Sequence, residues 1–205
     1  MKEQVSQKMQ DKIAFYRSMR RKEARPFFEF PPLPPSARLR YLPLDYDNYQ
    51  VLYELFAEED NPFINLEFKE KEKIGIYVVD LREFAKYSPK RGAFDWLIYW
   101  NDQPIGVLHL FDLSREKTNE KFKRCTIGFS IGKDFRRQGF AFEAIAHQIQ
   151  YVFEHFKDIE RIIAYTFPNN AASIGVLKKL GFTSNSKDYL STDRYSFFEK
   201  QRFNP

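Results

Sequence analysis

A hexapeptide in the second half of the chain, Arg136 to Ala141 (Arg-Arg-Gln-Gly-Phe-Ala), has residues suited to binding an anion. An apolar, strand-like run (127–131) precedes it, and a helix-like run (141–156) follows. The first N–H groups of a helix have no partner within it, and the helix dipole adds partial positive charge there. Glycine lets the main chain approach a phosphate, and arginine supplies forked donors that stay charged. These residues, called the anion turn below, predict a pyrophosphate site, although a helix with a basic first turn would show the same pattern.

A second segment, from Pro168 to Phe182, follows another apolar run (162–167) and opens a helix. Asn169 or Asn170 can cap this helix, and its end at Gly181 favours a left-handed residue. By itself the segment predicts only a well-capped helix. Two other phosphate-binding patterns are absent from the sequence, namely Gly-x-x-x-x-Gly-Lys-Ser/Thr and a Gly-x-Gly-x-x-Gly with a following acidic residue.

Together, the two segments resemble the GNAT superfamily of acyl-CoA-dependent N-acetyltransferases. Arg136, Gly139 and Ala141 match its Gln/Arg-x-x-Gly-x-Gly/Ala coenzyme A signature. The second segment is similar to a block found in the Rim-like branch, which includes ribosomal-protein N-terminal acetyltransferases. The matching positions are Pro168, Asn170, Ala172, Ser173, Leu177, Lys179, Gly181 and Phe182. The resemblance covers residues 37 to 200 and does not specify an acceptor.

The resemblance implies acetyl-CoA as co-substrate and a location for each part of it. The pantetheine arm would pair with strand 124–131, where this strand splays from strand 161–167, and a main-chain N–H near its end would polarise the acetyl oxygen. The phosphates would rest on backbone N–H groups of the anion turn, and Ser173 would lie near the sulfur. The residues implied in coenzyme binding are Phe129, Ile131, Arg136, Arg137, Gln138, Gly139, Phe140, Ala141, Asn170 and Ser173.

Two departures from the family pattern affect the expected chemistry. Many members carry a Tyr general acid where this chain has Leu177, which cannot donate a proton, so Ser173 is the remaining catalytic candidate at the thiolate. Thr126 stands where related enzymes often have a Glu general base. Asp95 on the neighbouring strand could replace that base through water, although an Asp at a strand end is usually solvated. A protein α-amino group, with a pKa of about 8, would need little base, which favours peptide N-termini over lysine side chains.

Composition favours one α/β domain. The 205 residues are 43% hydrophobic and include 22 Phe and 12 Tyr, enough for a sizeable core. There is no apolar run of membrane-spanning length and the N-terminus is charged, so we expect a cytoplasmic protein without a membrane partner. The single Cys125 rules out an internal disulfide and is interpreted as an inert, small hydrophobe. Three scattered histidines (His109, His147 and His155) are interpreted as structural or solvated, and we expect no metal site.

The formal net charge of +5 is concentrated near the N-terminus. Residues 1–30 hold eight Lys/Arg and four Asp/Glu, which leaves a net charge of only +1 for the rest of the chain. A nucleic-acid-binding domain would be expected to carry a basic stripe on the domain itself. The charge is therefore a property of the N-terminal arm and argues against nucleic acid as the main ligand.

We divide the chain into an arm with a connector (residues 1–36) and a GNAT-like domain (residues 37–205). Residues 1–25 have a weak apolar stripe at helical spacing and basic residues on the other faces, and a proline-rich connector follows. The amphipathic helix would fold back on its own domain or pair in a homodimer. A contact with the ribosome, nucleic acid or an acidic protein is the other interpretation.

The fold class expected for the domain is mixed α/β (α+β), a GNAT-like and mostly antiparallel sheet with helices on both faces. The coenzyme would lie beyond the carboxyl end of strand 124–131. The predicted strands are 37–42, 94–100, 105–112, 124–131, 161–167, near 182–189 and 194–199, with 113–123 as a loop. The predicted helices are 46–58 (capped by Asp45 or Asp47), much of 62–88, 138–156 and 170–180.

Our leading hypothesis is an acetyl-CoA-dependent N-acetyltransferase in which a primary amine attacks the thioester directly within a ternary complex. The acceptor would be a protein N-terminus or a small amine such as an antibiotic or polyamine. One alternative is a non-catalytic acyl-CoA-binding protein, favoured by the missing Tyr and Glu. Another is a ribosome- or nucleic-acid-associated protein that acts through residues 1–25.

Overall fold

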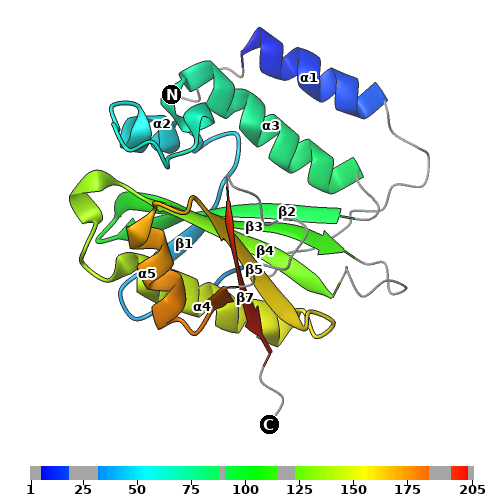
Figure 1. Ribbon diagram of the computed structural model, residues 1–205. Coiled ribbons are helices and arrows are strands. Elements are labelled where there is room, and N and C mark those ends of the chain that lie inside the picture. Colours follow the sequence, from blue (N-terminus) through cyan, green and yellow to red (C-terminus); the bar gives the residue numbers. More distant parts are fainter. Residues whose placement is uncertain (1–5, 19–31, 88–90, 115–122, 185–194, 203–205) are drawn as a thin grey trace.

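The computed structural model describes residues 6–18, 32–87, 91–114, 123–184 and 195–202. In these residues one mixed sheet has the strand order β1-β2-β3-β4-β5-β7-β6, with helices on both faces (Figure 1). The strands are β1 (Arg40–Pro43), β2 (Arg91–Trp100), β3 (Gln103–Ser114), β4 (Arg124–Ile131), β5 (Arg161–Thr166), β6 (Thr183–Ser184) and β7 (Ser196–Gln201). The helices are α1 (Gln7–Ser18), α2 (Gln50–Phe56), α3 (Lys71–Tyr87), α4 (Phe140–His155) and α5 (Ala171–Lys179), with short 3-10 turns η1 (Leu66–Lys69) and η3 (Lys133–Phe135). The predicted fold class is confirmed.

The two faces of the sheet bury separate cores. Helices α1, α2 and α3 cover one face, here the α3 face, and α4 and α5 cover the other, the α4 face (Figure 1). Side chains alternate along β2, where Trp96 and Ile98 join the core under α4 while Leu97 joins the core under α3. Asp95 shares the parity of Leu97 and therefore lies on the α3 face.

Strands β4 and β5 diverge near the middle of the sheet. They pair in parallel from Arg124 opposite Arg161 only as far as Ile127 opposite Ala164. Beyond this point β4 continues along β3 to Ile131, and β5 continues along β7 to Thr166. In the described part of the chain, residues 128–131 thus have no strand partner on the side of β5. The splay implied by the family resemblance is present.

Helix α1 lies along α3 (Figure 1). Met9 is almost fully buried there, and Asp80 of α3 accepts hydrogen bonds from Lys12 Nζ (2.5 Å) and Tyr16 Oη (2.7 Å). Burial, together with the Asp80 carboxylate, raises the pKa of Tyr16 to about 12. The sequence left open whether the N-terminal helix folds back on its own domain, pairs in a homodimer or contacts another molecule. In the structure, residues 7–18 fold back on their own chain. The division at residue 36 stays a prediction.

The first domain helix begins later than predicted. Asp45 Oδ1 accepts the N–H of Tyr46, and Asn48 Oδ1 accepts the N–H of Asp45, so these side chains close a turn before the helix. Helix α2 then starts at Gln50, with Tyr49 at its N-cap and no side-chain cap. The predicted capping by Asp45 or Asp47 is wrong. The loop predicted for 113–123 is wrong at its start, because β3 continues to Ser114. Residues 115–122 of that loop and residues 185–189 of the strand predicted near 182–189 lie outside the described residues.

Candidate functional site: an open helix terminus beside a split in the sheet

The anion turn delivers the chain from β4 into α4 with an open helix N-terminus. Gly139 occupies the N-cap with φ +82° and offers no side-chain cap, and Arg137 also has a positive φ of +60°. Glu143 is the residue whose N–H bonds back to Gly139 O, at 3.1 Å. The N–H groups of Phe140 and Ala141 therefore precede the first helical hydrogen bond and point out of the terminus. This is the geometry that an anion site needs.

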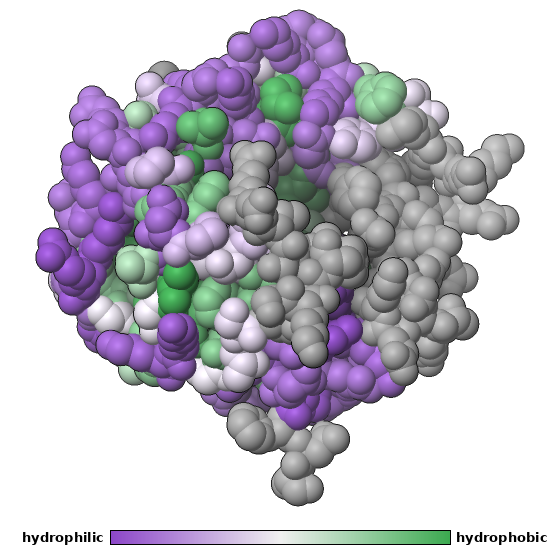
Figure 2. Space-filling model, viewed as in Figure 1, coloured by the Kyte–Doolittle hydropathy of each residue, from purple (hydrophilic) through white to green (hydrophobic). Residues whose placement is uncertain are grey.

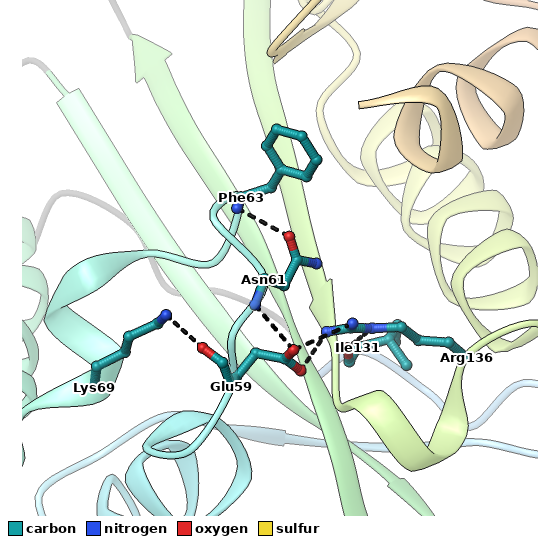
Figure 3. A network of polar contacts seen from close by, with 6 residues as sticks. All are labelled: Glu59, Asn61, Phe63, Lys69, Ile131 and Arg136. Carbon is teal, nitrogen blue, oxygen red and sulfur yellow. Dashed lines mark hydrogen bonds and ion pairs between the residues drawn. The ribbon is translucent and has the colours of Figure 1, made fainter. Parts of the chain in front are cut away.

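The two arginines of the anion turn have different surroundings. Arg136 Nε donates to Ile131 O at 2.9 Å, and its Nη2 pairs with Glu59 Oε2 at 2.6 Å (Figure 3). The Glu59 side chain is only 7% exposed, so this is a largely buried ion pair. Arg137 is exposed and makes no hydrogen bond or ion pair within the described residues. The guanidinium of Arg137 is thus the one available to an incoming anion, while that of Arg136 is engaged.

Glu59 also anchors the loop that leads to Phe63. Its Oε1 accepts the N–H of Asn61 at 3.2 Å, and Asn61 Oδ1 accepts the N–H of Phe63 at 3.0 Å (Figure 3). Lys69 Nζ donates to the carbonyl oxygen of Glu59. The carboxylate of Glu59 therefore holds the anion turn and the Phe63 loop at a fixed relative position.

Arg38, which the sequence analysis did not single out, lies beside the anion turn. Its backbone N–H and Nε each donate to Glu143 at 2.7 Å, and Ser36 Oγ donates to the same carboxylate at 2.7 Å. Arg38 Nη1 also donates to Gln138 O at 3.3 Å. Burial alone would raise the pKa of Glu143, but these hydrogen bonds outweigh it and leave the pKa below its usual range. Arg38 thereby balances the negative charge of Glu143 in the first turn of α4. The sequence near Arg38 gives no sign of this role, because its partners lie about a hundred residues away.

A pocket of about 120 Å³ opens where β4 and β5 diverge. Asn170 Oδ1 caps α5 by accepting the N–H of Ser173 at 3.2 Å, which confirms one of the two predicted caps and holds both residues at the pocket wall. In the view of Figure 2, apolar residues lie left of centre, among hydrophilic ones. The lining residues are Phe63, Ile127, Gly128, Phe129, Ala164, Tyr165, Thr166, Phe167, Asn170, Ser173, Leu177 and Tyr195. Three predicted coenzyme residues, Phe129, Asn170 and Ser173, therefore meet in one pocket. Ile131 is the last residue of β4 and the anion turn follows it, and neither is among the lining residues.

Asp95 is not solvated, in contrast to the expectation for a strand-end Asp. It is 1% exposed, and its Oδ2 accepts from Tyr77 Oη at 2.5 Å and lies 2.8 Å from His109 Nδ1. Asp95 and His109 face each other in the β2–β3 register. Burial and the Asp95 carboxylate raise the pKa of Tyr77 well above its ordinary value. Asp95 is not among the pocket-lining residues, and the sequence could have suggested this pair only through the hairpin register.

Cys125 is fully buried in the core of the α4 face, where burial raises the pKa of its thiol. This environment fits the interpretation as an inert, small hydrophobe. Thr126, at the position expected for a Glu base, donates from Oγ1 to Asp112 at 2.9 Å.

Among the described residues no cluster of His, Cys, Asp or Glu could hold a metal ion, and no helix has the length and apolarity to cross a membrane.

An open helix terminus at the end of a central strand, next to a split sheet, is the arrangement expected of an acyl-CoA site. Residues 38–183 match the acetyltransferase (GNAT) domain family, and the chain belongs to this family. The chain is 38% identical over 117 residues to the [ribosomal protein uS5]-alanine N-acetyltransferase of Escherichia coli (strain K12). That match covers 55% of this chain and 56% of the relative, so the chain spans about half the length of the curated relative it matches.

Solved structures share the fold over most of the chain. The ribosomal-protein-S5-alanine acetyltransferase of Vibrio fischeri superposes with a TM-score of 0.62 and 20% identity, over 85% of this chain and 95% of that one. Mycobacterium smegmatis RimJ, solved with a CoA-disulfide, superposes with a TM-score of 0.63 and 17% identity, over 80% of this chain and 81% of that one. The match to the Escherichia coli relative confirms the resemblance to the Rim-like branch, and the solved structures show the shared fold.

Proposed function

We propose that this chain is an acetyl-CoA-dependent N-acetyltransferase that moves an acetyl group to a primary amine. The observation that carries the proposal is the uncapped start of α4 at the left-handed Gly139, which follows the strand that borders the pocket lined by Asn170 and Ser173. The open N–H groups suit a pyrophosphate, and the pocket suits a slender thioester arm. Membership of the GNAT family supports the same activity.

The described residues fit the parts of acetyl-CoA. The diphosphate would rest on the N–H groups of Gly139, Phe140 and Ala141, with Arg137 as the free cation. The unpaired side of β4 from Gly128 to Ile131 would supply main-chain hydrogen bonds to the pantetheine arm, because its N–H and C=O groups face no strand there. Asn170 and Ser173 would contact the arm from α5.

The reaction needs a neutral amine and a stabilised leaving group. The amine nitrogen attacks the thioester carbonyl carbon, the C–S bond breaks, and the thiolate takes up a proton, so that one ammonium and one thioester give an amide, a thiol and one released proton. Holding both substrates in one pocket supplies part of the acceleration. Leu177 has no donor, and the other lining residues with a hydroxyl are Tyr165, Thr166, Ser173 and Tyr195. Of these, Ser173 is the residue that the family resemblance places near the sulfur, so we assign it as the donor to the thiolate.

A protein N-terminal α-amine is the acceptor class that we favour. The Escherichia coli relative is named for a ribosomal protein alanine, and an α-amine with a pKa of about 8 needs less help to lose its proton than lysine does. A small amine is the second acceptor class. It would enter the same pocket and would require no protein surface.

A non-catalytic acyl-CoA-binding protein is the competing function. Leu177 is fully buried in the pocket wall at the position of the expected proton donor, and Thr126 stands in place of the expected base. Such a protein would keep acetyl-CoA affinity and show no turnover. Acetylation of a peptide therefore separates the two functions.

The first experiment is thermal unfolding with acetyl-CoA, with NADH and ATP as control ligands. Acetyl-CoA at 100 times its Kd should add about 2.7 kcal/mol to the stability of the folded chain. Gly139→Val should abolish the shift, because a branched residue is strained at φ +82° and crowds the N–H groups. Gly175→Ala, in a helix where a Cβ meets nothing within 4 Å, is the matched control and should keep it.

Turnover is then measured by mass spectrometry on peptides with an N-terminal alanine, with polyamines and aminoglycosides in parallel. Arg137→Gln, at an exposed side chain, covers the case in which Gly139→Val fails to fold and should weaken the acetyl-CoA shift. The absence of any shift at millimolar acetyl-CoA would contradict the proposal. A shift without turnover on any amine would assign the chain to the non-catalytic class.

A further inference from the structure

His109 is held in one orientation by groups that are themselves buried. Its Nδ1 lies 2.8 Å from Asp95 Oδ2, and the same oxygen accepts from Tyr77 Oη at 2.5 Å. The raised pKa of Tyr77 keeps this hydroxyl protonated, so it serves as a donor to Asp95. The hydrogen-bond network therefore assigns the proton to Nδ1 of the imidazole, and the lone pair to Nε2.

The opposite ring nitrogen is left available. Nε2 makes no hydrogen bond within the described residues, and the His109 side chain keeps 11% of its surface exposed. The rings of Phe68 and Phe111 stack on the imidazole, with centroids 5.9 and 5.5 Å away, and fix its plane. The titratable groups that face the ring in the described structure are Asp95 from β2 and Tyr77 from α3.

His109 adjoins the pocket through a glycine. It pairs with Gly128 across β3 and β4, and a Cβ built on Gly128 would lie 3.3 Å from His109 Cδ2. Gly128 is itself a lining residue of the pocket. The glycine therefore lets the imidazole edge lie against the very strand segment that borders the split in the sheet.

The imidazole and the predicted coenzyme contacts lie on opposite sides of the sheet. Asn170 and Ser173 reach the pocket from α5, on the α4 face, whereas His109 packs with Phe68 on the α3 face. With the coenzyme on the α4 face and its thioester threaded through the split, an acceptor would meet the thioester from the α3 face. Its amine would then arrive on the side of His109.

We propose that His109, oriented by Asp95, is the general base for the acceptor amine, and this inference rests on the proposed function. Nε2 takes one proton from the ammonium, directly or through one water, and the neutral amine attacks the thioester carbonyl carbon. The C–S bond breaks, the second N–H proton goes to the thiolate, and the imidazolium returns its proton to solvent. Asp95 is a positioning residue that fixes the tautomer and stabilises the imidazolium, as a buried carboxylate does beside a catalytic histidine.

The test compares His109→Gln with the wild type over a pH series at saturating acetyl-CoA and peptide. Loss of a general base should lower kcat by about 100-fold or more near neutral pH. The ratio of wild-type to variant kcat should shrink by about tenfold towards pH ~9.5, because an α-amine with a pKa of about 8 is then neutral without help. A merely structural role would lower kcat by the same factor at every pH.

Three further variants sharpen the result. Asp95→Asn keeps the shape but loses the carboxylate, so kcat should fall with the same pH trend, and Tyr77→Phe should have a smaller effect. His155→Gln, at an exposed histidine near the end of α4, is the matched control and should leave kcat unchanged. Thermal unfolding with acetyl-CoA should show the same ligand shift in all four variants.

The possible outcomes are distinct. A His109→Gln chain that keeps kcat within threefold of wild type, or loses it equally at every pH, overturns the base assignment and leaves the acetyltransferase function standing. Loss of the acetyl-CoA shift in this variant would also overturn it, because the effect would then be structural. A wild-type chain that binds acetyl-CoA but acetylates no amine overturns the proposed function itself, and the base role with it.

Discussion

Neighbouring residues of one type serve different purposes at the anion turn. Arg136 is directed inward, where Glu59 and the carbonyl of Ile131 hold its guanidinium, and Arg137 stays exposed beside the open N–H groups of α4. A charge that is buried and paired contributes to stability mainly because its removal leaves the partner buried without a counter-charge. A free cation at a helix N-terminus contributes to anion affinity instead.

Substituting the two arginines separately should therefore change different quantities, the unfolding free energy for Arg136 and the acetyl-CoA affinity for Arg137. Arg136→Gln leaves Glu59 largely buried without its cation, so the free energy of unfolding should fall by about 2 kcal/mol or more. Arg137→Gln should leave the unfolding free energy within about 0.5 kcal/mol of wild type and raise the Kd for acetyl-CoA. Chemical denaturation and calorimetric titration measure the two quantities. Equal effects of both variants on stability would contradict the distinction.

At the scale of elements, β3 and β4 lie close together at the end that meets the anion turn. Gly106 pairs with Ile131, and a Cβ on Gly106 would lie 2.3 Å from the backbone oxygen of Ser130. A backbone atom cannot rotate away as a side-chain tip can. The close approach of these strands thus depends on a residue without a side chain.

Gly106→Ala should force the two strands apart and lower the unfolding free energy by about 1–3 kcal/mol. Because the displaced segment leads into the anion turn, acetyl-CoA affinity should fall as well. Gly175→Ala in α5 meets nothing within 4 Å and should raise stability by up to about 1 kcal/mol through helix propensity. Melting temperatures of both variants, with and without acetyl-CoA, provide the check. A neutral Gly106→Ala would show that the strands can separate at no cost.

The whole molecule is organised around a sheet with two differently used faces. The α4 face carries the helix terminus and the α5 contacts expected to hold the coenzyme, and the α3 face carries the Asp95–His109 pair under η1 and α3. Helix α1 forms an outer layer over α3 (Figure 1). Its contribution should therefore be to stability rather than to coenzyme binding.

Met9→Ala, which removes the buried anchor of α1, should lower the unfolding free energy by about 2 kcal/mol or more. Acetyl-CoA affinity should stay unchanged, since α1 packs on α3 and not on the α4 face. Phe15→Ala is the control on the same helix, because Phe15 is 57% exposed and its loss should be nearly neutral. Denaturation curves and acetyl-CoA titrations decide the matter. A loss of affinity in Met9→Ala would connect the arm to the coenzyme site.

Local features of the chain could be predicted because each depends on residues close together in sequence. Strand β4 and helices α4 and α5 were found to within two residues, since hydrophobic periodicity and the flanking Gly139, Asn170 and Gly181 define them. The start of α2 was missed because the side chains of Asp45 and Asn48 bond to backbone N–H groups and close a turn that competes with the helix.

The sequence by itself thus determined the elements, the anion turn and the family pattern, all of which are written in short spans of residue types. Only the tertiary structure decided which side chains meet. The guanidinium of Arg136 is paired because Glu59, which lies 77 residues earlier in the chain, packs beside it. Asp95 is buried because the β2–β3 register places it opposite His109. A pairwise contact between distant residues depends on strand register and on how the layers pack, and neither is encoded at either position alone.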